Sequence, residues 1–317
     1  MSPSREPSHT RPLAAFALLL AATSCACSSS DPPAAQDLGG DTGDHSIGEL
    51  DGGFTIDGAP DGGPTDDSPS SESGPKSAVL TATIRDFKLY KAGDATTDSD
   101  FENVPKTDAA GKPSDTYLGP WDDRGIVTDA LGSDGKPVYK AATGGTLTTH
   151  GKAAFDQWYR DVAGVNLPVS YPIHLTKNAD GSYEYDSEKS GVALSASEPT
   201  KMFFPIDDGT PYATAFGNQG LPHNYSFTVE LHTTFVYKGG EFFYFRGDDD
   251  VFVYVNRKLV IDLGGIHGPE TSKVTVDSLG LTIGAEYPLD FFSAERHVTG
   301  SNILFQTTLD LKAAVGK

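Results

Sequence analysis

The strongest constraint on the fold is an alternation of apolar and polar side chains in the last third of the chain. Over residues 227–237 five side chains of one parity are apolar: Phe227, Val229, Leu231, Phe235 and Tyr237. A period of two is the pattern of a β-strand with one buried face. Residues 242–245 are continuously aromatic, which predicts a strand that is covered on both faces. The pattern therefore predicts a sheet that packs against a core.

Two further runs continue the β pattern. In residues 251–255 the valines share one face of the predicted strand, and Phe252 and Tyr254 share the other. A second apolar run, 259–263, follows after Asn256-Arg257-Lys258. This spacing predicts two strands that are joined by a tight hairpin turn.

One segment has helical periodicity instead. Over residues 151–163 four apolar side chains recur at the spacing of one helix face: Phe155, Trp158, Tyr159 and Val162. The spacing predicts a helix whose aromatic face belongs to the core. Further strands are predicted at 79–87 and 303–309. The fold class indicated is mainly β, an antiparallel β-sandwich or barrel with one or two short helices.

The first 24 residues have the pattern of an export signal. Two arginines precede the apolar run 13–22, which is too short to span a membrane but suits a signal peptide. Small residues followed by Cys25 resemble the bacterial lipobox, so we expect a signal peptide over 1–24 and a lipid anchor on Cys25. Cys27 is the alternative lipid acceptor. An ordinary secretory signal with two incidental cysteines is the other interpretation.

Residues 25–75 are predicted to be a disordered, lipid-anchored linker. Residues 26–75 contain 10 Gly, 6 Pro and 11 acidic residues but no Lys or Arg, so they bury too little apolar surface to fold. Their charge of −11 is about half of the formal net charge of −20. The folded domain is expected over 76–317, where 32 acidic and 22 basic residues leave −10.

The composition argues against several classes of function. The acidic charge argues against a nucleic-acid partner, which requires a basic face, and against docking on anionic lipid. We therefore expect membrane contact through the lipid anchor only. Cys25 and Cys27 are the only cysteines, so the domain has no disulfide, Cys-ligated zinc or cysteine nucleophile. Common hydrolase, metalloprotease and nucleotide-binding motifs are missing, and we do not expect an enzyme.

The sharpest local feature is a run of three aspartates, Asp248, Asp249 and Asp250, between two predicted strands. Adjacent carboxylates repel, and calcium, which takes about six to eight oxygen ligands, compensates them well. In an extended chain alternate residues point to opposite sides. A cis peptide between Asp248 and Asp249 would place that pair on one side. The alternative is a solvated acidic turn.

A glycine pair follows the next predicted strand. Gly264 and Gly265 permit positive φ and close approach of the backbone to a ligand, and His267 comes soon after them. The alternative is an ordinary loop after a strand.

A third polar group lies near the C-terminus. It begins with Glu295, Arg296 and His297 and ends with Asn302. Asn302 can offer its amide oxygen to a cation and its amino group to a sugar hydroxyl. Glu295 and Arg296 are alternatively a structural ion pair.

These motifs resemble the fibro-slime domain of bacterial lipoproteins. The runs that carry the resemblance are 245–256, 262–267 and 294–302, and it extends over about 78–310. Fibro-slime domains are similar to the protective-antigen-type β-barrels, which include the yeast flocculin and adhesin lectins. The resemblance implies a protective-antigen-like barrel at the cell surface.

The resemblance also implies site residues. In those lectins two consecutive aspartates joined by a cis peptide hold a calcium ion that binds sugar hydroxyls, and a later asparagine completes the site. The implied metal ligands are Asp248, Asp249 and Asn302. The residues expected to contact the ligand are Asp250, Gly264, Gly265, His267 and His297. Two positions depart from the pattern, because Asp250 and Arg257 stand where the related proteins often have glycine.

The function predicted from the sequence is that of a cell-surface lipoprotein with a calcium-dependent carbohydrate-binding or adhesion domain. Its partner would be a glycan or surface polysaccharide, and its location the cell envelope, at the outer membrane or cell surface. One alternative is a structural matrix or surface-assembly protein in which calcium only stiffens the barrel. Another is a glycan-processing enzyme that uses Glu295.

Overall fold

The computed structural model describes residues 77–88, 90–91, 93–101, 121–207, 223–297 and 300–312. The chain divides into two units, 1–68 and 69–317, and the described residues all belong to the second. The predicted signal peptide (1–24) and linker (25–75), with Cys25 and Cys27, lie outside the described residues. Within them, none of the helices has the length and apolar character that crossing a membrane requires.

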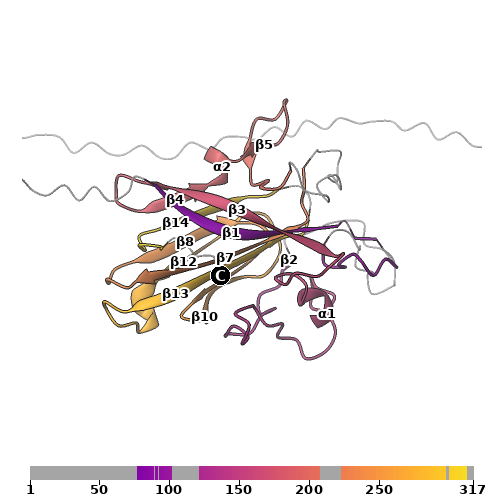
Figure 1. The fold of residues 1–317 in the computed structure, drawn as a ribbon, viewed down its shortest axis with the longest axis horizontal. Helices are drawn as coiled ribbons and strands as arrows, with labels where there is room; N and C mark the ends of the chain where they lie inside the picture. The colour runs from indigo at the N-terminus through magenta and orange to yellow at the C-terminus, as the bar shows by residue number, and fades with distance from the viewer. Residues whose placement is uncertain are drawn as a thin grey trace, which may run out of the picture. The chain divides into compact units, whose positions relative to one another are not determined.

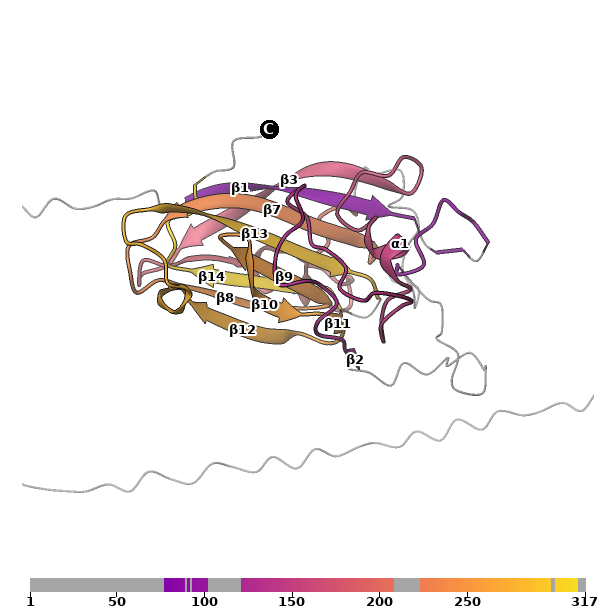
Figure 2. The same ribbon diagram turned by 90° about the horizontal axis from the view of Figure 1, so that it is seen from below.

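Ten antiparallel strands form one curled sheet (Figures 1 and 2). In chain order they are β1 (Ser77–Phe87), β3 (Asn166–Lys177), β4 (Tyr183–Asp186), β7 (Phe227–Val236), β8 (Phe242–Gly247), β9 (Asp250–Val255), β10 (Lys258–Leu263), β12 (Glu270–Thr275), β13 (Glu286–Glu295) and β14 (Ile303–Thr307). Their order in the sheet is β10-β9-β13-β7-β1-β3-β4-β14-β8-β12. The end strands β10 and β12 come together, so the sheet is a nearly closed barrel. The predicted fold class is confirmed.

The remaining elements are short. Two small ribbons pair β2 (Trp121–Asp122) with β11 (Gly265–Ile266) and β5 (Val192–Ala193) with β6 (Lys201–Met202). The helices described are α1 (Lys152–Phe155), α2 (Ser187–Ser190) and the 3₁₀ turn η2 (Val276–Leu279).

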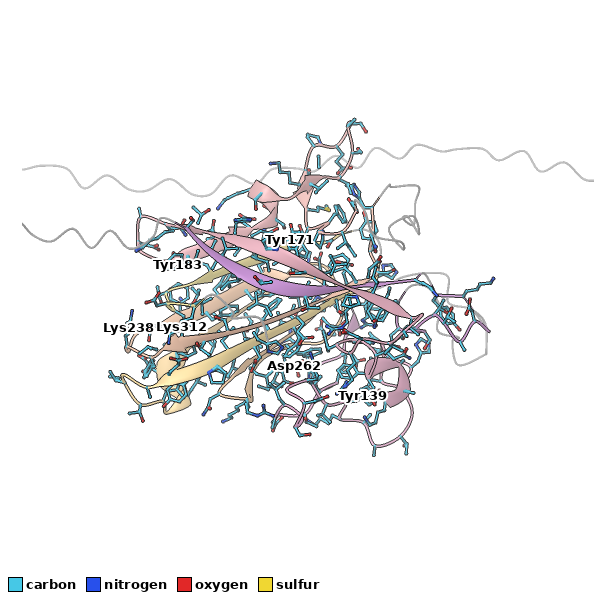
Figure 3. The ribbon with its side chains drawn as sticks, in the orientation of Figure 1. Tyr139, Tyr171, Tyr183, Lys238, Asp262 and Lys312 are labelled. Carbon is cyan, nitrogen blue, oxygen red and sulfur yellow. The ribbon has the colours of Figure 1, made fainter. Side chains whose placement is uncertain are left out.

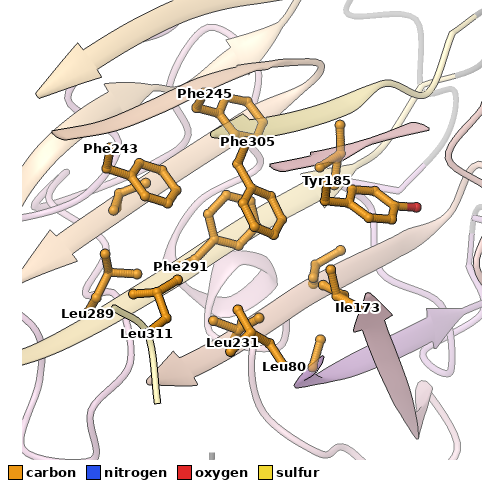
Figure 4. Close-up of a cluster of buried hydrophobic side chains, with 14 of the residues drawn as sticks. Leu80, Ile173, Tyr185, Leu231, Phe243, Phe245, Leu289, Phe291, Phe305 and Leu311 are labelled. Atoms are coloured by element: carbon orange, nitrogen blue, oxygen red, sulfur yellow. The ribbon is translucent and has the colours of Figure 1, made fainter. Parts of the chain in front are cut away.

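The barrel has an inner core and a second core on its outside. The inner core contains Val251, Val253 and Val255 of β9, and Figure 4 shows part of it: Leu80, Ile173, Tyr185, Leu231, Phe243, Phe245, Leu289, Phe291, Phe305 and Leu311. Phe252 and Tyr254 face the other way and belong to the outer core. An outer layer, residues 93–101 and 121–165, covers them. Both faces of β9 are buried, and the valines and the aromatic residues divide between them as predicted.

The predicted helix at 151–163 is much shorter than expected. Only Lys152–Phe155 is α-helical. The side-chain amide of Asn166 donates to the carbonyls of Gln157 and Arg160. These two carbonyls therefore do not accept the backbone N–H groups that would continue the helix. The aromatic face is nevertheless buried in the outer core, as predicted.

Two expectations about strands β8 to β10 differ in outcome. The aromatic run 242–245 is fully buried on one face only, since Phe242 and Tyr244 stay half-exposed. The hairpin turn after β9 is present, and both Asn256 (φ 49°) and Arg257 (φ 64°) are left-handed. The Arg257 guanidinium donates to the carbonyls of Leu131 and Gly132 in the outer layer, which compensates for the missing glycine.

A charge cluster centred on the buried Glu230 ties the outer layer to the sheet, with His232 at its exposed edge. Glu230 of β7 accepts hydrogen bonds from Arg85 of β1 at 2.6 Å and from Lys136 of the outer layer. His232, on the same face of β7, bridges Glu230 at 2.5 Å and Asp290 of β13 at 2.6 Å. Burial opposes ionisation of Glu230, but His232, Arg85 and Lys136 lower its pKa to about 2.

The His232 bridge should make stability depend on pH. Burial opposes a charge on this imidazole, but Asp290 and Glu230 raise its pKa from 6.5 to about 9. Because the native state binds this proton more tightly than the unfolded chain, the stabilisation is complete below pH 6.5 and is lost as pH rises through 9. Thermal unfolding should therefore show a smaller loss of Tm over this window in His232→Gln than in the wild type. His174→Gln, at an exposed position of β3, should follow the wild type. Equal losses in all three proteins would contradict this role of His232.

Candidate functional site

The three aspartates lie where β8 gives way to β9. The peptide between Asp248 and Asp249 is cis, and Asp250 is the first residue of β9. The exposed fractions of the three residues are 6%, 4% and 0%, so the alternative of a solvated acidic turn is wrong. Because β13 pairs with β9 and β14 pairs with β8, the end of β13 and the start of β14 lie beside the aspartates.

Asp248 is held by the segment before β14. The backbone N–H of Asn302 donates to Oδ1 of Asp248, and Nδ2 of Asn302 donates to Oδ2 at 3.0 Å. A Cβ at Gly300 would lie 3.0 Å from the same Oδ2, so a side chain at this position would crowd the Asp248 carboxylate. Burial raises the pKa of Asp248 to about 6, against the bonds from Asn302. With the amide nitrogen engaged, Oδ1 of Asn302 is the atom suited to ligate a cation.

Asp249 is bonded to backbone donors from two segments. Its Oδ1 accepts from the N–H of His267 at 3.2 Å, and its Oδ2 accepts from the N–H of Arg296 at 3.1 Å. Burial and the neighbouring Asp248 carboxylate raise the pKa of Asp249 to about 8. An ionised pair is therefore costly in this environment unless a cation joins it.

Asp250 differs from the other two because protein groups engage both of its oxygens. Oδ2 accepts from Nε of Arg296 at 2.6 Å, and both side chains are fully buried. Oδ1 accepts from the N–H of Gly265 at 2.8 Å. Asp250 was predicted to contact ligand, but in the structure it is bonded within the protein.

Glu295 and Arg296 do not form the ion pair that the sequence left open. Neighbouring residues of an extended chain point to opposite faces, and Arg296 faces the outer layer with Asp250. Neither carboxyl oxygen of Glu295 has a donor in hydrogen-bonding geometry among the described residues, although Ser301 lies near enough to favour its ionised form. Burial, Asp249 and Asp248 raise the pKa of Glu295 well above its usual range. This buried position does not suit a general acid that must reach a glycosidic bond.

At Gly264 and Gly265 the backbone of the loop approaches the backbone of β2 and of the residue after it closely. A Cβ at Gly264 would lie 2.8 Å from the carbonyl oxygen of Asp123, and Gly265 pairs with β2 at φ 138°. His267 is buried, and its ring nitrogens lie 2.9 Å and 3.2 Å from the carbonyls of Gly268 and Leu263. Burial opposes a charge on this ring, but the two carbonyls raise the pKa of His267. Contacts of these residues with a ligand remain predictions.

Sequence reasoning missed how strongly Arg296 is engaged. Its Nη1 donates to the carbonyls of Asp100 at 3.3 Å and Thr148 at 2.8 Å, and its guanidinium lies 4.5 Å from the centre of the Trp158 ring. These partners come from distant parts of the outer layer and carry no local sequence signal. If the alternation of β13 is extended by one residue, Arg296 lies on the same face as Ala294, which pairs with Asp250. The side on which Arg296 lies could therefore have been predicted.

The donor atoms around the cis peptide fit a hard cation. They are two carboxylates and one amide oxygen, which are the ligand types that calcium prefers. In the parts of the chain that the structure describes, no three His, Cys, Asp or Glu side chains are grouped to hold a metal. A cation at this position would therefore need Asn302 as well as further oxygen ligands. The burial of two adjacent carboxylates with no basic side chain bonded to them among the described residues is consistent with such a site.

Comparison with sequence families supports a PA14 domain in this chain. Residues 180–314 match that domain. The match includes β4 to β14, and with them Asp248, Asp249 and Asn302. It leaves out β1, β3 and the outer layer.

The relatives are much longer proteins. The chain is 41% identical to protein psiQ of Dictyostelium discoideum over 198 residues, which are 59% of this chain and 19% of psiQ. It is 37% identical to protein psiD of the same organism over 248 residues, 76% of this chain and 43% of psiD. The chain thus spans less than half of either relative. Both are from Dictyostelium rather than bacteria, so a bacterial source and the fibro-slime assignment stay predictions.

Among solved structures, a PA14 sugar-binding domain from an RTX adhesin matches 74% of this chain and 95% of its own. The identity is 15% and the TM-score is 0.25. At this TM-score the likeness supports no conclusion about the present chain.

Proposed function

We propose that this chain is a cell-surface protein whose barrel binds carbohydrate through a calcium ion. The observation that carries the proposal is the burial of two adjacent carboxylates, Asp248 and Asp249. Each carboxylate accepts hydrogen bonds from N–H groups, and neither has a side-chain salt bridge among the described residues. A divalent cation would offset the cost of burying two such charges.

The residues that would hold calcium are the carboxylates of Asp248 and Asp249 and the amide oxygen of Asn302. When bound, calcium supplies coordination positions that the hydroxyl oxygens of a sugar can occupy. The protein's part is to hold the two carboxylates in place and to favour their ionised form, through the backbone N–H groups of His267, Arg296 and Asn302.

The predicted ligand contacts divide by burial. Asp250, Gly264, Gly265 and His267 are buried, and His297 alone of the five is only half-buried. His297 is therefore the strongest of them as a direct contact to a glycan. Gly265 and His267 donate their backbone N–H groups to Asp250 and Asp249, and Asp250 pairs with Arg296.

The proposal extends to location. The acidic linker would hold the domain away from a membrane in which a lipid on Cys25, or on Cys27, is the only anchor. This arrangement suits an outer-membrane or cell-surface protein whose partner is a glycan or a surface polysaccharide.

A glycan array with the full chain tests the proposal directly. In calcium we expect retention on a subset of glycans, and in EGTA we expect that retention to disappear. Binding that ignores EGTA, or no binding to any glycan, would contradict it. If calcium raises Tm while no glycan binds, the alternative of a structural matrix protein with a structural calcium ion is favoured.

A further inference from the structure

Arg296 occupies an unusual position beside the proposed cation site. Its guanidinium pairs with Asp250 at 2.6 Å with no exposed surface on either side chain, and its backbone N–H donates to Asp249 at 3.1 Å. One residue therefore contacts two of the three adjacent carboxylates. It does so through two chemically different groups, one charged and one neutral.

We propose that Arg296 sets the charge of the cation site, so that the site selects a divalent ion. This inference rests on the proposed calcium binding. By neutralising Asp250, the guanidinium removes that carboxylate from the ligand set. Among the proposed ligands, Asp248 and Asp249 then supply two negative charges, which match one divalent cation. The nearby carboxyl of Glu295 is not one of these ligands, and its burial favours the neutral form. Without Arg296, Asp250 would add a third charge at the same strand end and favour a trivalent ion.

The outer layer keeps Arg296 turned away from the metal. Carbonyls of Asp100 and Thr148 accept from its Nη1, and the Trp158 ring lies against the guanidinium. These contacts need the planar, multiply donating head of arginine, because a lysine ammonium cannot make them together. They come from residues 93–101 and 121–165, outside the span that matches the PA14 domain. The outer layer thus holds in place the arginine that pairs with Asp250.

Charge-changing variants of the full chain separate this role from a purely structural one. In Asp250→Asn the Arg296 charge is no longer balanced, so calcium affinity, measured by titration calorimetry, should fall at least about tenfold. In the double variant Asp250→Asn with Arg296→Met both charges are gone, and affinity should return to within about threefold of the wild type. In Arg296→Met alone, the ratio of terbium(III) to calcium affinity should rise at least about tenfold.

Two further variants serve as controls. Arg246→Met removes a guanidinium two residues before Asp248 that is bonded to Glu188 at the surface, and it should leave both affinities unchanged. Arg296→Lys keeps the charge but loses the outer-layer contacts, so its Tm should fall while calcium affinity stays near that of the wild type. This variant tests the inference even if Arg296→Met does not fold.

The outcomes distinguish the inference from the proposed function. If the wild type shows neither a calcium-binding heat nor a rise in Tm, the proposed calcium binding is wrong. If it binds calcium but Asp250→Asn binds equally well, the inference alone is wrong. An affinity that follows the loss of Tm across all variants, rather than their charge, would also overturn it.

Discussion

Replacing Asp249 with asparagine should abolish the increase in stability that calcium gives to the wild type. At free calcium about 100 times Kd, binding to the native state alone adds about 2.7 kcal/mol to the free energy of unfolding. The substitution removes one of two ionised ligands, and the new amide would place N–H₂ opposite the backbone N–H of His267 or Arg296, which now donate to this side chain. Both effects act against calcium.

Urea unfolding in calcium and in EGTA measures this prediction, with the difference taken within each variant so that changes in the metal-free protein cancel. Asp262→Asn is the matched control, because Asp262 also accepts two backbone hydrogen bonds, from Gly125 and Gly264, but lies on β10 (Figure 3). It should keep the full calcium increment. An Asp249→Asn protein that keeps the increment would exclude this residue as a ligand. Loss of the increment with unchanged glycan binding would make calcium structural.

The fold was predictable where side-chain parity is strict. The alternation in 251–255 identified the strand and the residues that share each of its faces, because each face had its own type of apolar residue. The helix at 151–163 was overpredicted because the competing hydrogen-bond donor is the side-chain amide of Asn166, which lies outside the periodic run. Exposure of Phe242 and Tyr244 was missed because no pattern within a continuous aromatic run shows which face packs.

The site was predictable only in part, for a similar reason. The three aspartates attract attention as sequence because adjacent carboxylates need a compensating group. The sequence does not show that Asp250 is compensated by Arg296, because that pair is set by the register of β9 against β13. The contacts of Arg296 with Thr148 and Asp100 span 148 and 196 residues and depend on how the outer layer packs.

Replacing Trp158 with alanine should cause the largest loss of stability among the variants considered. Trp158 is fully buried in the outer core, where its ring contacts Phe101, Phe155 and Tyr159. Truncating a buried tryptophan typically costs about 3–5 kcal/mol, because both the apolar contacts and the cavity contribute. That is a large part of the total stability of a typical domain, about 5–15 kcal/mol.

Two polar partners place this loss at the upper end of the range. Nε1 of Trp158 donates to the buried Asp100 at 3.2 Å, and the ring face lies against the Arg296 guanidinium. Removing the indole weakens the environment of a buried carboxylate and a buried guanidinium together, and such losses exceed those of apolar contacts alone. Urea unfolding in EGTA should show the fall in the free energy of unfolding. The control is Leu147→Ala, at an exposed position of the same layer, which should change the free energy of unfolding by less than about 0.5 kcal/mol. A Trp158→Ala protein within about 1 kcal/mol of the wild type would mean that the outer layer adds little to the barrel, and that Arg296 is held in place by Asp250 alone.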